Sequence, residues 1–215
     1  GNLTGRVRAY IGLGANLADG AASLAAGVYA LARLPGARLA GVSRLYATEP
    51  VGLVDQPEFR NAAAALDVPR GDDPETGAVA LFIALKRLER AFGRQERQRG
   101  GPRELDLDLL LFGRHALSVE RPAGTRSADP AKPADLVVPH RLAGERLFVL
   151  APLADLAPRL VPPGWRETVA SARKRRERVE GMNAVRPVAR WGGDGWVPLE
   201  SAQSRTAGGR SRSNM

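Results

Sequence analysis

The chain has 215 residues, of which 44% are hydrophobic, and this is enough for one sizeable domain with a buried core. It contains no cysteine, which excludes disulfides, thiolate metal sites and cysteine nucleophiles, and its 2 histidines argue against a histidine-rich zinc site. The net charge of +9 indicates an anionic partner but does not distinguish a nucleotide from a nucleic acid or a membrane surface.

No apolar run approaches the length of a membrane span, and the N-terminal residues lack the pattern of a secretory signal. We therefore expect a soluble, cytoplasmic protein with no membrane contact. Basic residues concentrate in two segments, 86–103 and 173–178. We interpret the second segment as the solvated face of a helix.

The first expected elements follow from the spacing of apolar residues. Residues 7–14 alternate apolar side chains with other residues, which predicts a strand that ends at a glycine. Helical spacing then predicts a helix that Asp19 caps and that stops before Pro35. Residues 37–48 and 60–68 are predicted as the second and third strands.

Asp73 and Pro74 are typical of the start of a second helix, whose C-cap is expected at Gly93. The apolar stripe of this helix consists of Leu81, Leu85, Leu88 and Phe92. Residues 104–112 are the fourth strand. The order strand, helix, strand, strand, helix, strand predicts an α+β fold, a ferredoxin-like βαββαβ sandwich.

The remainder of the chain is expected to add C-terminal strand and helix elements to this sandwich. Residues 121–135 read as an exposed loop, and 145–158 as a further strand and turn. We expect one domain over 1–165, a basic C-terminal extension over 166–200 that packs on it, and a disordered tail over 201–215.

Two aspartates interrupt the fourth strand. Side chains at i and i+2 of a strand share a face, so Asp106 and Asp108 are expected to project together, opposite the leucines between them. Their mutual repulsion requires compensation, and paired hard oxygen ligands suit Mg²⁺. The alternative is an ordinary ion pair with an arginine such as Arg103.

The basic segment before this strand favours a metal–polyphosphate site. It runs off the second helix into a glycine-containing loop that bears four arginines, whose guanidinium groups match phosphate oxygens: Arg94, Arg97, Arg99 and Arg103. The chain has no G-x-x-x-x-G-K-[ST] stretch, so a P-loop enzyme is excluded.

Four segments together resemble the 6-hydroxymethyl-7,8-dihydropterin pyrophosphokinase family of folate biosynthesis. They are "YIGLGANL", "YATEPVGLVDQPEFRNAAAAL", "GPRELDLDLLLFG" and "VVPHRLAGERLFVLAPLADLAP", in the order of the family and within residues 10–158. The resemblance implies a ferredoxin-like fold that binds ATP and two Mg²⁺ ions. It also implies transfer of the β,γ-pyrophosphoryl group of ATP to the pterin hydroxymethyl oxygen, with release of AMP.

The resemblance also implies the roles of individual residues. Asp106 and Asp108 would hold the two Mg²⁺ ions, and Arg94, Arg99 and Arg103 would join them in catalysis. The pterin-binding residues would be Thr48, Val51, Phe59, Asn61, Asp106 and Phe148. The ATP-binding residues would be Lys86, Glu89, Arg94, Arg103, Leu109, His140 and Arg146. The family often has glutamine where Lys86 stands and a tryptophan where Gly100 stands, and an insertion near 122–133 is unusual for it.

Two other classes of protein share some of these sequence features. A nucleic-acid-binding module would fit the charge, but aromatic residues make up only 5% of the chain and no RNP-type stacking motif is present. A metal-dependent phosphatase or nucleotidyltransferase could use the same two aspartates. We expect a monomer that binds no nucleic acid, with other folate-pathway enzymes as candidate partners.

Overall fold

A seven-stranded antiparallel sheet forms the centre of the computed structural model, which describes residues 5–16, 19–48, 58–98, 105–125 and 134–200. For residues 94–98 only the course of the helix is described. In chain order the elements are β1 Arg6–Ala15, α1 Gly20–Ala32, β2 Arg38–Val42, β3 Leu45–Thr48, β4 Phe59–Pro69, α2 Pro74–Gln98, β5 Leu105–Phe112, β6 Leu117–Glu120, β7 Asp135–Val138, the short 3₁₀ helix η1 Ala143–Glu145, α3 Leu147–Leu156, α4 Val169–Glu180, β8 Val185–Trp191 and β9 Trp196–Pro198. None of the described helices is both long and apolar enough to cross a membrane.

The strand order of the large sheet is β5–β1–β4–β3–β8–β9, and β2 pairs with the part of β4 that β3 leaves open. β1 therefore lies between β4 and β5, which are the third and the last strands of the expected sandwich. A split βαβ arrangement requires this order. This confirms the ferredoxin-like α+β fold. Strands β6 and β7 form a separate two-stranded sheet.

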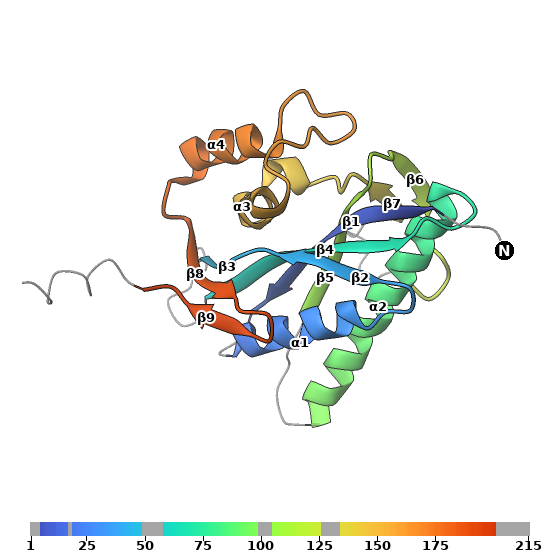
Figure 1. Cartoon of the computed structure of the whole chain (residues 1–215), viewed down its shortest axis with the longest axis horizontal. Coiled ribbons are helices and arrows are strands. Elements are labelled where there is room, and N and C mark those ends of the chain that lie inside the picture. Colours follow the sequence, from blue (N-terminus) through green and yellow to red (C-terminus); the bar gives the residue numbers. More distant parts are fainter. Residues whose placement is uncertain (1–4, 17–18, 49–57, 99–104, 126–133, 201–215) are drawn as a thin grey trace, which may run out of the picture.

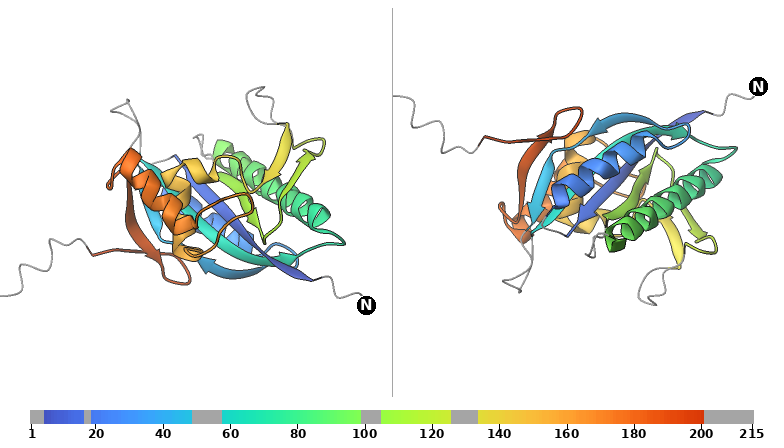
Figure 2. Two further views of the ribbon diagram at one scale, coloured as in Figure 1. Left: turned by 90° about the horizontal axis from the view of Figure 1, so that it is seen from above. Right: turned by 90° about the horizontal axis from the view of Figure 1, so that it is seen from below.

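Helices cover both faces of the sheet (Figures 1 and 2). On one face, α1 and α2 bury a core that includes Leu24 of α1, Leu85 of α2 and Ile11 of β1. On the other face, α3 and α4 bury a second cluster, in which Leu150 packs near Leu110. Because α3 and α4 cover only part of their face, part of the sheet surface stays open beside them.

The expected second strand is divided in two at Ser43. Its backbone N–H donates to the carbonyl of Ala63 at 2.9 Å, and its hydroxyl accepts from the N–H of Ala63 at 2.8 Å. This buried serine substitutes for regular ladder hydrogen bonds, so β2 and β3 follow different parts of β4. β3 is thereby also able to pair with β8.

Of the three residues predicted to cap α1 and α2, only one caps its helix as expected. The carboxylate of Asp73 accepts from the backbone N–H of Thr76 at 2.8 Å and so caps α2 as expected. Asp19 makes no side-chain cap hydrogen bond to α1. The expected C-cap at Gly93 is wrong, because α2 continues to Gln98 and Gly93 does not take the positive φ of a helix-ending glycine.

Helix α3 replaces the strand that the sequence predicts over 145–158, so this prediction is wrong. Its buried residues include Leu147, Leu150, Ala151 and Ala154, which have helical spacing. A run that is apolar on every side does not distinguish a buried strand from a buried helix by its periodicity. The interior Pro152 adds to the ambiguity, because proline cannot donate the usual helical hydrogen bond.

The C-terminal elements pack on the rest of the chain. β8 pairs with β3 and β9 pairs with β8. The ring centroids of Trp191 and Trp196 lie 5.0 Å apart, and the indole N–H of Trp196 donates to the carbonyl of Ala21 in α1 at 3.0 Å. The division at residue 165 stays a prediction, and residues 201–215 lie outside the described residues.

A polar network fixes α3 and α4 above the sheet. The hydroxyl of Tyr46, a fully buried residue of β3, donates to the Asp155 carboxylate of α3 at 2.9 Å. Arg44 donates to the same carboxylate at 2.9 Å, and the guanidinium of Arg173 in α4 lies 5.9 Å from the Tyr46 ring centroid. Burial, reinforced by the charge of Asp155, raises the pKa of Tyr46 to about 12.

We expect Tyr46→Phe to lower the free energy of unfolding at pH 7 by about 1–2 kcal/mol, because the buried carboxylate loses a donor. The raised pKa also means that the folded state prefers the neutral phenol. Its contribution to stability is therefore complete below the unfolded value of 10.0 and is lost as the pH rises towards about 12.

Urea unfolding at pH 7, 10 and 11.5 checks this expectation, with the half-exposed Tyr29, changed to Phe, as the matched control. The wild type and Tyr29→Phe should lose stability above pH 10 more steeply than Tyr46→Phe. Equal pH dependence in all three proteins would show that Tyr46 does not carry the effect.

Candidate active site

The two aspartates project from one face of β5. Asp106 and Asp108 are exposed, whereas Leu105, Leu107 and Leu109 are buried against α1 and α2. The alternation of the strand therefore places both carboxylates on the face that α3 only partly covers, as the i, i+2 spacing predicts.

Two glycines of β1 lie directly opposite these aspartates. Gly14 pairs with Asp106 and Gly12 pairs with Asp108, and on the other side of β1 Gly14 pairs with Asn61 of β4. A Cβ atom on Gly14 would lie 3.1 Å from the Asn61 side-chain oxygen. The missing side chains thus keep the centre of this sheet face flat and leave room for a ligand beside the carboxylates.

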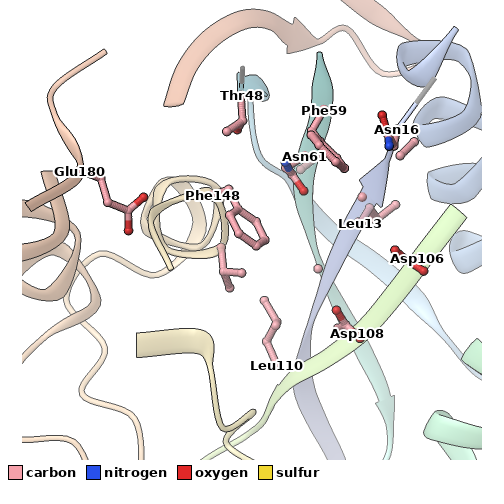
Figure 3. Close-up of a pocket in the computed structure, with 15 residues that line it drawn as sticks. Leu13, Asn16, Thr48, Phe59, Asn61, Asp106, Asp108, Leu110, Phe148 and Glu180 are labelled. Atoms are coloured by element: carbon pink, nitrogen blue, oxygen red, sulfur yellow. The ribbon is translucent and has the colours of Figure 1, made fainter. Parts of the chain in front are cut away.

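A cavity of about 620 Å³ lies over this glycine floor. Asn61, Asp106 and Asp108 line it from the sheet, and Phe148 lines it from α3 (Figure 3). Phe59, at the start of β4, lines it near Asn61. The cavity therefore combines aromatic walls with polar groups that converge on the sheet, which is typical of a small-molecule site.

Two polar atoms that line this cavity have no hydrogen-bond partner among the residues that the structure describes. They are the buried side-chain oxygens of Asn16 and Thr48. Because such groups are costly unless something satisfies them, they indicate a polar ligand edge at this end of the cavity. Asn16 was not among the residues predicted from the sequence, because a lone asparagine after a glycine-containing strand has no distinctive local pattern.

The predicted pterin-binding residues gather here. Thr48, Phe59, Asn61, Asp106 and Phe148 all line the same cavity, although they come from four separate elements. Val51, the sixth predicted member, lies outside the described residues.

Lys86 and Glu89 of α2, predicted to line the ATP site, lie at the outer edge of β5. The Lys86 ammonium donates to the Glu89 carboxylate at 2.8 Å, and Glu89 accepts from the backbone N–H of Leu107 at 2.7 Å. Burial raises the pKa of Glu89, and the charge of Lys86 opposes this shift.

His140 and Arg146 lie near the other end of the aspartate pair. Burial lowers the pKa of His140, the charge of Asp108 opposes this, and the charges of Arg121 and Arg146 add to it. His140 Nδ1 accepts from the backbone N–H of Leu142 at 3.3 Å, which assigns the proton of the neutral ring to Nε2. His140 can therefore donate from Nε2 to an anionic ligand.

Arg121 was not found in the sequence analysis, because it follows β6, far from the basic segment. Its guanidinium lies 5.1 Å from the Phe82 ring centroid, and the Arg146 guanidinium lies 5.6 Å from that of Phe148. The charges of both arginines act on His140, and Arg146 lies over Phe148, which lines the cavity. Of the predicted arginines of the basic segment, Arg99, Arg103 and the side chains of Arg94 and Arg97 lie outside the described residues.

The pair Asp106 and Asp108 fits a magnesium site. Within the described ranges, no group of three or more histidine, aspartate or glutamate residues could enclose a metal ion. Two carboxylates beside an open cavity suit Mg²⁺, which completes its coordination with water and phosphate oxygens rather than with a protein cage.

Known proteins resemble this chain in sequence. The sequence model of the family described as 7,8-dihydro-6-hydroxymethylpterin-pyrophosphokinase (HPPK) matches residues 10–158. The 2-amino-4-hydroxy-6-hydroxymethyldihydropteridine pyrophosphokinase of Pseudomonas aeruginosa is 42% identical over 159 residues, which are 74% of this chain and 86% of that protein. The enzyme of the same name from Methylorubrum extorquens is 42% identical over 165 residues, 77% of this chain and 90% of that protein.

A solved structure shares the fold. Wild-type HPPK-DHPS of Plasmodium falciparum, solved with pteroate, matches 93% of this chain with a TM-score of 0.60 at 14% identity. The match covers 48% of that protein, so this chain spans about half its length.

Gly14→Ala tests the packing of the cavity floor. We expect it to change the free energy of unfolding by no more than about 1 kcal/mol, because a better strand former offsets a tight contact that the Asn61 side chain can relieve. The Asn61 side-chain amide signals should shift in a ¹H–¹⁵N spectrum. Gly5→Ala, where a new Cβ would meet nothing within 4 Å, is the control. Unchanged Asn61 signals in Gly14→Ala would contradict the close contact.

Proposed function

The chain belongs to the 7,8-dihydro-6-hydroxymethylpterin-pyrophosphokinase family and is a pyrophosphokinase of folate biosynthesis that uses ATP, and we propose that the cavity over β1 and β5 is its active site. One observation supports this most: the two exposed carboxylates of β5 face two glycines at the floor of a cavity with aromatic walls. The substrate there would be 6-hydroxymethyl-7,8-dihydropterin, with ATP as the donor.

In this proposal the flat pterin ring lies between Phe59 and Phe148. Aromatic walls bind a bicyclic ring by stacking, and the Asn61 amide can both donate to and accept from its pyrimidine edge. The unpartnered oxygens of Asn16 and Thr48 would find partners on the same ligand. Val51 stays a predicted member of this site.

The sheet register orders the remaining groups from the pterin end to the phosphate end. Asn61 and Asp106 flank Gly14, Asp108 comes next on β5, and the charge of Asp108 acts on His140. Asp106 therefore lies between the pterin and the phosphates, which supports its double assignment to the pterin and to a metal ion. We propose that Asp106 and Asp108 hold two Mg²⁺ ions, which would neutralise negative charge on the ATP phosphates.

The ATP side would be formed by His140 and Arg146, with Lys86 and Glu89 at the edge of β5. Leu109 would contribute its backbone there, because its side chain is buried on the face of β5 that α1 and α2 cover. A neutral His140 that donates from Nε2, together with Arg146, would orient phosphate oxygens. Catalytic contacts from Arg94, Arg99 and Arg103 stay predictions.

In the reaction, the pterin hydroxyl oxygen bonds to the β-phosphorus while the bond from that phosphorus to the α,β-bridging oxygen breaks. The hydroxyl proton is released, and AMP leaves with the bridging oxygen. For such a displacement the protein chiefly supplies orientation and electrostatic stabilisation. A monomeric state, a cytoplasmic location and contacts with other folate-pathway enzymes belong to the same proposal.

Asp106→Ala and Asp108→Ala test the metal assignment. Each should lower kcat by about 10²–10³-fold or more, because a group that stabilises transition-state charge is lost. The assay follows AMP and the pterin diphosphate by chromatography. In parallel, Mg²⁺ with a non-hydrolysable ATP analogue should raise the melting temperature of the wild type but not of either variant. Asp72→Ala, a change at an exposed loop residue, is the control. Retained activity in either variant would refute the assignment, and release of ADP instead of AMP would refute the proposed reaction.

Thr48→Val and Asn61→Ala test the pterin end. Both should weaken pterin binding about 10–100-fold in calorimetric titrations and leave ATP binding unchanged, because a site loses affinity when a hydrogen-bonding group is removed from it. Thr48→Val should also raise the melting temperature of the ligand-free protein, because it removes a buried oxygen that has no partner within the described part of the chain. A loss of ATP affinity as large as the loss of pterin affinity would contradict this placement.

A further inference from the structure

Strand β5, which carries both aspartates, forms one edge of the large sheet. It pairs with β1 on one side, and the strand order ends with it on the other. The outward N–H and C=O groups of an edge strand need partners, since unpaired backbone groups leave the strand free to bend or to pair elsewhere.

At Leu107 these partners are side chains of α2. The Glu89 carboxylate accepts from the N–H of Leu107 at 2.7 Å, and the Lys86 ammonium approaches the carbonyl of Leu107 at 3.3 Å. The ammonium also lies 2.8 and 3.0 Å from the two Glu89 oxygens. One ion pair thus takes the place of a neighbouring strand at this residue.

Leu107 is the residue between Asp106 and Asp108. Its N–H belongs to the peptide group that joins it to Asp106, and its C=O belongs to the one that joins it to Asp108. Holding both groups fixes the two peptide planes that flank Leu107, and these planes set the directions of the two carboxylates. Metal ligands need to be held within about 0.5 Å of the working geometry, so this restraint acts where precision matters most.

The ion pair is itself held in place. Lys86 and Glu89 are three residues apart on α2, so they share one flank of the helix, and both side chains are about four-fifths buried, at 19% and 20% exposure. The Lys86 ammonium also lies 5.5 Å from the Phe82 ring centroid. These contacts restrict the rotamers of both side chains and make the pair a rigid support.

We propose that Lys86 and Glu89 act as positioning residues, clamping the edge of β5 so that Asp106 and Asp108 keep the geometry that metal binding requires. This role rests on the proposed function of the two aspartates and differs from contact with ATP, which the family resemblance implies for the same two residues.

Amide hydrogen exchange of the ligand-free protein tests the clamp directly. In Glu89→Ala the Leu107 amide should exchange about tenfold faster or more than in the wild type, because its acceptor is gone. Glu89→Gln retains an acceptor oxygen and should restore most of the protection. The control is Glu75→Ala, which removes the same charge from an exposed position in the first turn of α2.

Steady-state kinetics separate positioning from nucleotide contact. For Glu89→Ala we expect kcat to fall about 10²-fold with a change in KM for ATP of less than about threefold, because misplaced ligands impair the chemical step. Lys86→Gln, the residue frequent in the family, keeps a donor for the Leu107 carbonyl and should retain more activity than Lys86→Ala.

The outcomes are distinct. Unchanged exchange at Leu107 in Glu89→Ala would overturn the clamp, and so would a rise in KM for ATP with kcat unchanged, which would indicate direct contact with ATP. The exchange experiment needs neither substrate nor metal, so its result stands apart from that of the proposed reaction.

Discussion

Asp106 and Asp108 stand two residues apart on one face of β5, and their like charges repel one another. Much of the surrounding structure is arranged to tolerate this pair. Lys86 lies at the edge of the same strand, and the charges of Asp108, Arg121 and Arg146 all act on His140. Glycines on the neighbouring strand leave the space in front of the carboxylates open. In the proposed function, divalent cations and phosphate oxygens bound there would lower the electrostatic free energy of the pair.

The cavity also requires a wall on the side opposite the sheet, held at a fixed distance from it. Helix α3 supplies it, and Phe148 stands in its first turn. The hydrogen bonds from Tyr46 and Arg44 to Asp155 anchor the other end of the helix to β3. Because this anchor lies near the end of α3 away from Phe148, Arg44, Tyr46 and Asp155 do not line the cavity. α4 then packs against α3 and keeps it in place.

Local sequence patterns sufficed to predict strand β5 with its two aspartates and the start of helix α2. Strict alternation places Asp106 and Asp108 on one face whatever the rest of the chain does, and helix α2 begins at a capping aspartate. The errors arose where tertiary contacts decide. Ser43 divides a strand because it bonds to Ala63 of β4, and α3 is a helix because its position against the sheet buries it on several sides. No local pattern reveals that Asn16 lines the cavity or that the charge of Arg121 acts on His140, since only the folded chain brings these groups together.

Strand β8 joins the sheet beside β3, although a large part of the chain separates the two in sequence. During synthesis on the ribosome, β1 and β5 emerge well before α4 and β8. The nascent protein therefore carries an unpaired β3 edge and an uncovered apolar surface until its C-terminal elements appear. A chaperone that shields the β3 edge would act in that interval. A chain that ends before α3 would expose Asp106 and Asp108 on β5 without the helix that faces them.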